Sequence, residues 1–405
     1  MKKFKLVTLL GIRPDYIRMF KLIKLLDQNK DIEHILVHSG QHYDPELFGV
    51  FMKEFNIRKP DIDLGVGLAL KEKGVSNHAY QVALLSERVF DMLEKVKPDA
   101  VMYLGDTNTV LSAVTVSRSG YPVIHLEAGG RSFDWRMPEE KNRIVIDHLS
   151  DALYSYLPRY KELLLAEGID DFRIKVIGNI IVDAVNEYMP QIDASKIMEE
   201  LGIKSKEFII FGLHREENIT NKEILENKLS DIARFAKEKN IPVVWPMMPR
   251  TKAQIEKFGL QNIIDQEIFI KTKPLGFFEF LNLEKNARLA VSDSGTVQEE
   301  TLLVGTPCVI ARRSTERPET IWAGATILEG FEGKDTLYNK MNEAWNMKTD
   351  WDRNVLNPEG GSPSERVYDD LIEKTKENYF ETSRNFETLK GNQLVKIAYG
   401  KPFGK

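Results

Sequence analysis

The chain has 405 residues, of which 42% are hydrophobic and 29% charged, so it is long enough to bury a sizeable core. Its length favours two domains, because a single core rarely extends beyond about 250–300 residues. The formal net charge of -5 and the pI of about 5.9 argue against a general nucleic-acid or membrane-surface binder, although they are compatible with a local basic pocket.

Cysteine, histidine and apolar runs narrow the class of protein further. The single cysteine, Cys308, excludes an intramolecular disulfide and a multi-cysteine zinc site. The seven histidines show no paired metal-ligand spacing, and no GxGxxG motif follows the first predicted strand, so we expect neither a metal nor a nicotinamide cofactor. The N-terminal apolar run is too short for a signal peptide, and no run of about 20 apolar residues occurs, so we expect a cytoplasmic protein without a membrane segment.

Short apolar runs alternate with longer amphipathic ones, a rhythm typical of a parallel sheet wrapped by helices. The predicted strands form two series, at residues 5–10, 34–39, 100–105 and 122–127, and at 207–213, 241–246, 267–271, 287–293, 307–311 and 325–330. A polar, poorly periodic stretch at 185–203 separates the two series. We therefore predict an α/β fold with two Rossmann-like, doubly wound domains at residues 1–183 and 184–362. A C-terminal helix and tail at 363–405 are expected to pack back on the first domain.

In doubly wound domains, ligands bind at the carboxyl ends of the strands, so the residues after each predicted strand form the candidate site. In the first domain these residues read "GIRPD", "SGQHYD", "GDTNT" and "LEAGGR". In the second domain they include "GLHREEN", "SDSGTVQEE" and "STERPE".

The "GIRPD" string has the features of an anion site. Gly11 permits a tight turn, Arg13 supplies a forked cation at the strand end, and Pro14 suits the first position of a helix. The alternative is a helix start with a solvated arginine, and this motif alone does not distinguish the two.

The "SDSGTVQEE" string predicts a helix N-terminus at Ser294 and Gly295, where free N–H groups and the helix dipole favour a phosphate. Glu300 lies farther along this helix and suits the hydroxyl pair of a ribose, as acidic residues do in dinucleotide folds. The stretch therefore predicts a nucleotide-binding site. The alternative is an ordinary N-cap by Asp293 or Ser294, followed by helix-favouring glutamates.

Two carboxylates of the first domain follow apolar strands. Asp106 comes after Gly105, and Glu127 ends the run "PVIHLE", where a charge costs free energy unless it is paired. We interpret both as functional. Glu139 and Glu140 follow a proline and are equally compatible with an ordinary acidic helix start.

Histidine supplies one further candidate. His214 ends a predicted strand and precedes Arg215, so it is placed to donate to a phosphate or to act as an acid, unless it is a structural histidine. His42 is a weaker candidate, and His148 reads as a packing residue of a helix.

Taken together, the strings "GIRPDYIRM", "SGQHYD", "GDTNT", "HLEAGGR", "PEEKNR", "IGNIIVDA", "HREEN", "SDSGTVQEE" and "TERPE" resemble the non-hydrolysing UDP-N-acetylglucosamine 2-epimerases. They occur in order over residues 5 to 375. The resemblance implies a glycosyltransferase-B-like fold of two Rossmann-type domains facing a cleft that holds a UDP-sugar, without a cofactor, usually in a homodimer. It also implies elimination of UDP to a glycal, followed by re-addition to give the C2 epimer.

Position by position, the resemblance implies catalytic roles for Asp106, Glu127, Glu139 and His214. It implies UDP-sugar binding by Arg13, Arg215, Ser294, Gly295, Glu300, Glu316 and Arg317. Gln41 and His42 match a region that contacts a second, activating UDP-sugar in bacterial members.

Two positions depart from the family pattern: Glu216 stands where a second arginine is common, and Met248 where a histidine is usual. These features resemble the branch that acts on modified UDP-sugars in capsule and O-antigen synthesis. A hydrolysing epimerase, a glycosyltransferase and a non-catalytic nucleotide-sugar sensor stay open as alternatives. The four catalytic candidates argue against the sensor, and a glycosyltransferase would need an acceptor.

Overall fold

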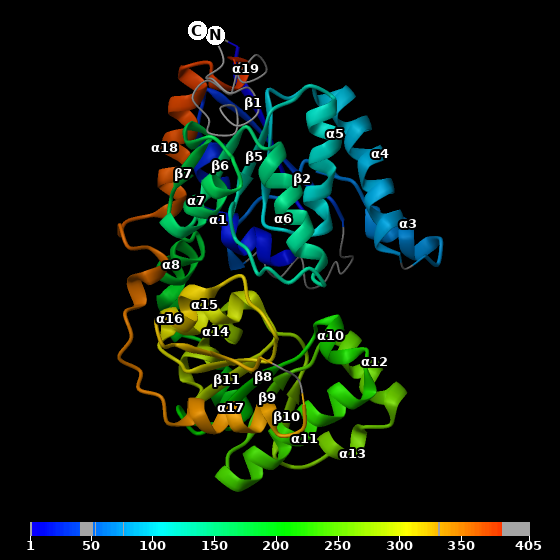
Figure 1. Cartoon of the computed structure of the whole chain (residues 1–405), viewed down its shortest axis with the longest axis vertical. Coiled ribbons are helices and arrows are strands. Elements are labelled where there is room, and N and C mark those ends of the chain that lie inside the picture. The colour runs from blue at the N-terminus through cyan, green and yellow to red at the C-terminus, as the bar shows by residue number, and fades with distance from the viewer. Residues whose placement is uncertain (1, 41–51, 53, 76, 331–332, 383–405) are drawn as a thin grey trace. The chain divides into compact units, whose positions relative to one another are not determined.

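The computed structural model describes residues 2–40, 52, 54–75, 77–330 and 333–382. The chain divides into two compact units. The first unit comprises Met1–Ala184 together with the described residues from Asn357 on, and the second comprises Val185–Leu356. Each is an α/β unit around a parallel sheet, which confirms the predicted fold class (Figure 1).

The first unit has a seven-stranded parallel sheet in the order β3-β2-β1-β4-β5-β6-β7. Its strands are β1 (Phe4–Leu10), β2 (Ile32–His38), β3 (Ile62–Asp63), β4 (Ala100–Leu104), β5 (Val123–Leu126), β6 (Ala152–Ser155) and β7 (Ile174–Val176). Its helices are α1 (Arg13–Gln28), α3 (Val66–Glu72), α4 (His78–Val96), η1 (Asn108–Ser112), α5 (Ala113–Arg118), α6 (Pro138–Leu149), α7 (Pro158–Ala166), η2 (Asp171–Arg173), α18 (Pro363–Lys376) and α19 (Tyr379–Thr382).

Helices cover both faces of this sheet, which is why its strands are near-continuous apolar runs. Leu85, Val89 and Leu93 of α4 pack with α5 and α6 against one face, while α1, α7 and α18 lie on the other side in Figure 1. The C-terminal helix α18 packs against α1. A hydrogen bond from Asn29 Nδ2 to Tyr368 Oη (2.7 Å) joins the two helices.

The second unit has a six-stranded parallel sheet in the order β10-β9-β8-β11-β12-β13. Its strands are β8 (Ile209–Gly212), β9 (Val243–Pro246), β10 (Phe269–Thr272), β11 (Leu289–Ser292), β12 (Cys308–Ile310) and β13 (Thr326–Leu328). Its helices are α9 (Ile197–Leu201), α10 (Glu216–Ile219), α11 (Lys222–Lys239), α12 (Pro249–Phe258), α13 (Gln261–Ile264), α14 (Phe277–Asn286), α15 (Gly295–Val304), α16 (Pro318–Trp322), α17 (Thr336–Trp345) and η3 (Arg353–Leu356), and α8 (Ile181–Asp193) runs into it from the first unit.

The chain returns to the first compact unit at Asn357. The side chain of Arg366 on α18 holds this segment, because its guanidinium hydrogen-bonds to Asn357 and to the carbonyl of Ile177. Asn357 in turn donates to the carbonyl of Gly361 (2.9 Å). These bonds fix the segment 357–362 to the first unit.

Strand order reverses direction once in each sheet, between β1 and β4 in the first unit and between β8 and β11 in the second. At such a switch point the connections leave in opposite directions, and a crevice opens at the carboxyl ends of the two strands. In the first unit this point lies between Gly11 and Asp106, and in the second between Leu213 and Asp293. Arg13 and Asp106 thus lie at the first switch point, and His214 and Ser294 at the second.

Candidate active site

In the first unit, the turn after β1 is organised by a carboxylate that the sequence did not single out. The Asp15 carboxylate accepts hydrogen bonds from the backbone N–H groups of Gly11 and Ile12, both at 3.0 Å, and from Arg18 Nη2 at 3.1 Å. Burial raises the pKa of Asp15 to about 6, although these donors oppose the rise. Arg13 is the first residue of α1, and Pro14 lies in its first turn, as predicted.

The predicted catalytic Glu127 pairs with Arg18, and both side chains are less than a tenth exposed. Glu127 directly follows β5 and has φ +72°, a left-handed conformation that costs a non-glycine residue about 1–3 kcal/mol. Such backbone strain persists where the surrounding structure enforces it, often at functional sites. Gly105 lies close by, since a Cβ added there would stand 3.5 Å from Glu127 Oε2.

Asp106, the second predicted catalytic carboxylate, pairs with Arg143 of α6. Asn142 Nδ2 donates to the Asp106 carbonyl at 2.8 Å, so two consecutive α6 residues hold this strand end. The Asp106 side chain is 23% exposed, whereas that of Arg143 is only 2% exposed. The buried Arg143 guanidinium therefore holds the Asp106 carboxylate at the carboxyl edge of the sheet, where this carboxylate is partly exposed.

The two glutamates at the start of α6 differ in environment. The Glu140 carboxylate is buried and accepts from the backbone N–H groups of Ser132 and Phe133 and from Arg143 Nη2 (2.7 Å). Burial alone would raise the pKa of Glu140, but Arg143 and Ser132 outweigh it and lower the pKa. Glu140 thus fixes the loop after β5, while Glu139 is only partly buried in the first turn of α6.

A buried histidine on β5 supports the loop that carries Glu127. His125 Nε2 bonds to the carbonyl of Gly105 (2.8 Å), and Nδ1 bonds to Asp147 Oδ1 (2.7 Å). Arg131 Nη1 contacts the other Asp147 oxygen at 2.7 Å. Burial disfavours the charged Asp147, yet His125 and Arg131 lower its pKa below the usual value. Because a carbonyl oxygen only accepts, His125 Nε2 is the donor of its bond to Gly105.

In the second unit, Asp293 joins the ends of β8 and β11. Its fully buried carboxylate accepts from the backbone N–H groups of His214 and Arg215 and from Asn218 Nδ2, at 2.9 to 3.1 Å. His214 Nδ1 lies 2.9 Å from Asp293 Oδ1, while the His214 side chain is 43% exposed. Burial would raise the pKa of Asp293, but His214, Asn218 and the Arg215 N–H outweigh it and hold the pKa well below the usual value.

Helix α15 begins at Gly295 with Ser294 as its N-cap, as predicted. Neither side chain caps the helix by a hydrogen bond. Ser294 makes no capping bond, and the Asp293 carboxylate accepts from the loop after β8 instead. Ser294 Oγ lies 3.1 Å from Thr296 Oγ1. A Cβ on residue 295 would stand 2.7 Å from Glu316 Oε1, so only glycine lets this carboxylate approach the helix start.

The "STERPE" segment is locked onto α15 by buried side chains. Arg317 Nε lies 2.5 Å from Glu299 Oε1, and Glu316 Oε2 lies 2.9 Å from Arg312 Nη2. Thr315 Oγ1 donates to Gln298 Oε1 at 2.9 Å. The predicted ligands Glu316 and Arg317 are thus both buried beside the start of α15.

Both departures from the family pattern, Glu216 and Met248, are linked to the start of α12. Glu216 Oε1 pairs with Arg250 Nη2 at 2.5 Å, and both side chains are more than half exposed. Met248 precedes α12 and is 36% exposed. The Glu216 carboxylate therefore offsets the charge of an arginine two residues after Met248.

Gln41 and His42 lie outside the described residues. No helix within the described part of the chain is both long and apolar enough to cross a membrane.

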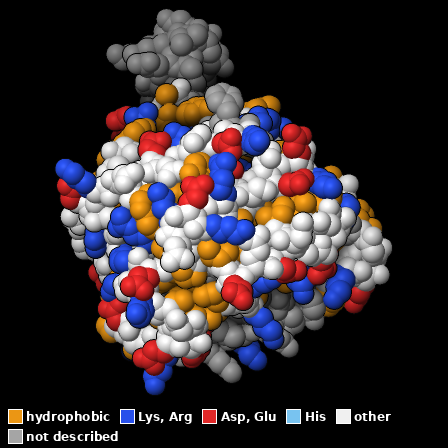
Figure 2. All heavy atoms as spheres, turned by 90° about the horizontal axis from the view of Figure 1, so that it is seen from below, with side chains coloured by type: hydrophobic (Ala, Val, Ile, Leu, Met, Phe, Trp, Pro, Cys, Tyr) orange, Lys and Arg blue, Asp and Glu red, His pale blue; other side chains and the backbone are white. Residues whose placement is uncertain are grey.

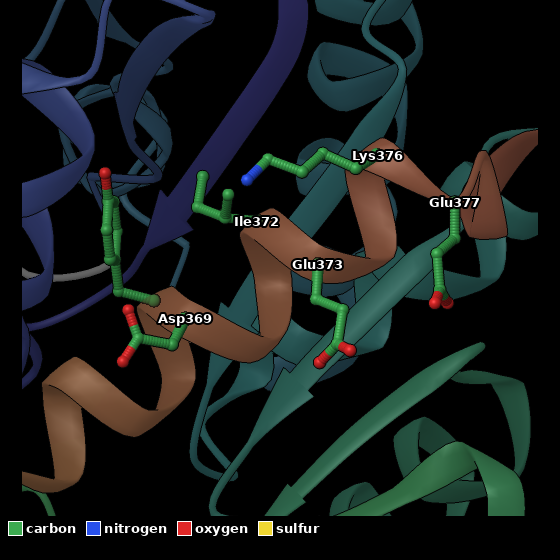
Figure 3. Close-up of a pocket in the computed structure, with 6 residues that line it drawn as sticks. Asp369, Ile372, Glu373, Lys376 and Glu377 are labelled. Carbon is green, nitrogen blue, oxygen red and sulfur yellow. The ribbon is translucent and has the colours of Figure 1, made fainter.

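On the face in Figure 2, Lys and Arg side chains are interspersed with Asp and Glu side chains. A surface pocket on α18 is lined by residues 368–377 of that helix and its end, whose acidic and basic side chains point apart in Figure 3. It contains none of the predicted site residues.

Four residues of these two sites were not singled out by the sequence analysis: Asp15, Arg18, His125 and Arg143. Asp293 was considered only as a helix cap. All five are buried. Arg18 and Arg143 pair with the predicted residues Glu127 and Asp106, and Asp293 binds the backbone of His214 and Arg215. The available signal was a charged residue inside an apolar stretch of a helix, as Arg18 is among Tyr16, Ile17 and Met19 of α1, all of them buried. A buried charge needs a partner, so such a position points to a paired carboxylate.

Comparisons with known proteins identify relatives across most of the chain. A family model described as UDP-N-acetylglucosamine 2-epimerase matches residues 24–369. A UDP-N-acetylglucosamine 2-epimerase of Methanococcus maripaludis is 36% identical over 354 residues, covering 85% of this chain and 94% of the relative. A UDP-2,3-diacetamido-2,3-dideoxy-D-glucuronate 2-epimerase of Pseudomonas aeruginosa is 33% identical over 336 residues, covering 80% of this chain and 88% of the relative.

A solved structure gives the same result for the fold. The UDP-GlcNAc 2-epimerase of Methanocaldococcus jannaschii, in complex with UDP-GlcNAc and UDP, is similar to this chain with a TM-score of 0.84 and 34% identity. The similarity covers 91% of this chain and 99% of that chain.

Proposed function

This chain belongs to the UDP-N-acetylglucosamine 2-epimerase family, and from this we propose that it interconverts a UDP-2-acetamido sugar and its C2 epimer without releasing free sugar. UDP-N-acetylglucosamine and UDP-N-acetylmannosamine form the simplest such pair. The observation that supports the proposal most is the pair of carboxylates, Glu127 and Asp106, held by buried arginines at the switch point of the first unit. The NMR test described below distinguishes this reaction from that of a hydrolysing epimerase, whereas a glycosyltransferase would need an acceptor.

The chemistry explains why carboxylates and cations are both needed. The hydrogen at C2 is not beside a carbonyl, so direct abstraction near neutral pH would be very slow. Breaking the bond from C1 to the diphosphate oxygen first places positive charge at C1, and a carboxylate then takes the C2 proton to leave a C1–C2 double bond. Protonation of C2 on the other face and return of UDP to C1 give the epimer. Carboxylates stabilise the cationic stage, while cations and helix ends stabilise the departing diphosphate.

We assign the proton transfers to Glu127, Asp106 and Glu139. Support for Glu127 comes from its strained backbone and its buried partner Arg18, which together define the direction of its carboxylate. Support for Asp106 comes from its partial exposure beside Arg143. Glu140 is assigned to the loop instead, because backbone N–H groups and Arg143 already occupy its carboxylate.

We assign UDP to residues of the second unit. The N–H groups at the start of α15 favour the diphosphate, and His214 and Arg215 lie across the switch point from that start. Glu300 is assigned to the ribose hydroxyls, and Glu316 and Arg317 to the edge of the same site. His214 presents its exposed side chain while Asp293 holds its Nδ1, so Nε2 is the atom that would donate to the leaving diphosphate.

Arg13 is assigned to the diphosphate as well, and Arg13→Ala should weaken UDP binding by about 1.5–3 kcal/mol, the range of a hydrogen bond to a charged group. Isothermal titration of UDP into wild type and variant measures this loss. Arg118→Ala, which removes an exposed arginine of α5, is the matched control and should bind UDP like wild type. Equal affinities for the Arg13 variant and the control would remove Arg13 from the binding site.

Two finer points belong to the same proposal. The relatives act on UDP-N-acetylglucosamine or on a diacetamido uronic sugar by their names, so the sugar of this chain is one of these two classes. Glu216 and Met248 favour a modified sugar, because they stand where the family commonly has an arginine and a histidine. We further propose a homodimer, which the family resemblance implies, and a cytoplasmic location, which the apolar runs of the sequence predict.

The test is an incubation of the protein with UDP-N-acetylglucosamine in heavy water, followed by NMR of the sugar signals. Deuterium at C2 together with a second UDP-sugar is the expected result. Free N-acetylmannosamine would identify the hydrolysing reaction instead. If nothing changes, the same experiment with UDP-2,3-diacetamido-2,3-dideoxyglucuronate separates a different sugar from a different function.

A further inference from the structure

A second carboxyl group lies beside Glu300 in the interior of the second unit. Glu284 belongs to α14, which packs against α15, and the two helices are neighbours in Figure 1. Its side chain is fully buried next to the apolar cluster that includes Leu283, Ala287 and Cys308. Neither Glu284 oxygen accepts a hydrogen bond from an N–H or hydroxyl group of the described residues, and no described cation forms an ion pair with it.

The surroundings of Glu284 require it to be a neutral acid. An isolated buried carboxylate costs several kcal/mol, and a group in that position takes up a proton instead. The charge of Glu300 on the neighbouring helix acts on this carboxyl, and two carboxyl groups side by side can share a hydrogen bond only if one of them carries a proton. Burial, with the nearby charge of Glu300, raises the pKa of Glu284 well above the usual value. Cys308 remains a neutral thiol there because burial raises its pKa too.

We propose that Glu284 is a positioning residue for UDP recognition: as a carboxylic acid it donates a hydrogen bond to the Glu300 carboxylate and fixes its orientation toward the ribose hydroxyls. This inference rests on the proposed function, which assigns the ribose to Glu300. A carboxylate has about four acceptor positions, so one bond from Glu284 leaves enough for both hydroxyls of a ribose. A bond from an acid to a carboxylate is also among the strong hydrogen bonds, which suits a fixed orientation.

Two variants separate donation from packing. Glu284→Gln keeps a donor of the same shape, whereas Glu284→Met keeps length and apolar packing but removes the donor. The probes are UDP and 2′,3′-dideoxyuridine diphosphate, whose dissociation constants are measured by calorimetry. Wild type should bind UDP about 10-fold or more tightly than the dideoxy analogue, and Glu284→Gln should keep both constants within about twofold. Glu284→Met should weaken UDP about 10-fold while its affinity for the dideoxy analogue changes less than about twofold.

The outcomes distinguish this role from the function on which it rests. If Glu284→Met weakens both nucleotides equally, or neither, the positioning role is wrong while the nucleotide site stands. If wild type fails to bind UDP, the proposed function fails, and this role with it. A second measurement does not depend on the Met variant: the infrared band of a protonated carboxyl at neutral pH should be present in wild type and missing from Glu284→Gln. Identical spectra would overturn the proposal.

Discussion

Glu127→Gln should slow hydrogen exchange at C2 of the UDP-sugar by about 10²–10⁴-fold, the contribution of a positioned general base or acid, and should leave UDP affinity unchanged. The amide keeps the shape of the side chain and the left-handed backbone at this position, but it cannot take up the C2 proton. The measurement is the rate of deuterium incorporation from heavy water, followed by NMR, with UDP affinity by calorimetry beside it.

The matched control is Glu94→Gln, which makes the same chemical change on the exposed face of α4. It should exchange deuterium at the wild-type rate. Arg18 would lose one of its two carboxylate partners in Glu127→Gln, so a thermal melt must show that the variant stays folded. Exchange at the wild-type rate in a folded variant would remove Glu127 from the catalytic set.

Much of the fold was predictable because the strands are covered on both faces and therefore read as apolar runs. Each predicted strand overlaps an observed one, for example 100–105 with β4 and 287–293 with β11. The analysis of apolar runs missed β3, β6 and β7. The run at β6, "ALYS", begins three residues after the end of α6 and is too short to show a period of its own.

The site was predictable to the extent that it follows strand ends. The resemblance and the strand-end rule both led to Asp106, Glu127, His214 and Ser294, and the structure places each of them directly after a strand or one residue beyond it. The residues that hold them were not predictable in the same way. Arg18 and Arg143 lie inside helices. Arg18 pairs with Glu127, 109 residues away in the sequence, and Arg143 pairs with Asp106, 37 residues away. Only the packing of α1 and α6 on the sheet brings these pairs together.

Asp293 shows why a local rule can assign the wrong partner. An Asp or Ser before a helix predicts an N-cap, because its side chain can accept from the first free N–H groups. Here the parallel pairing of β8 with β11 places the β8 loop beside Asp293, and the His214 and Arg215 N–H groups bind it instead. Neither Asp293 nor Ser294 therefore caps α15 with its side chain.

Asp293→Asn should lower the free energy of unfolding at neutral pH by about 2–4 kcal/mol and weaken UDP binding about 10-fold or more. An asparagine offers one acceptor oxygen, and its NH₂ group would face an N–H donor of His214 or Arg215. The pKa of Asp293 is lowered in the folded protein, so its contribution is present above the usual value of 3.8 and is lost as the pH falls below it. The stability gap between wild type and variant should therefore narrow as the pH falls toward about 3.

Denaturant unfolding at neutral and acidic pH, with UDP titration at neutral pH, measures both effects. Asp350→Asn is the control, because this aspartate is exposed at the end of the segment after α17 and should change neither quantity. A gap that is constant with pH would mean that the variant fails through packing rather than through the lost charge. A stable variant that binds UDP weakly would mean that Asp293 contributes only to binding, by positioning His214 and Arg215. Measuring stability and affinity together distinguishes these outcomes.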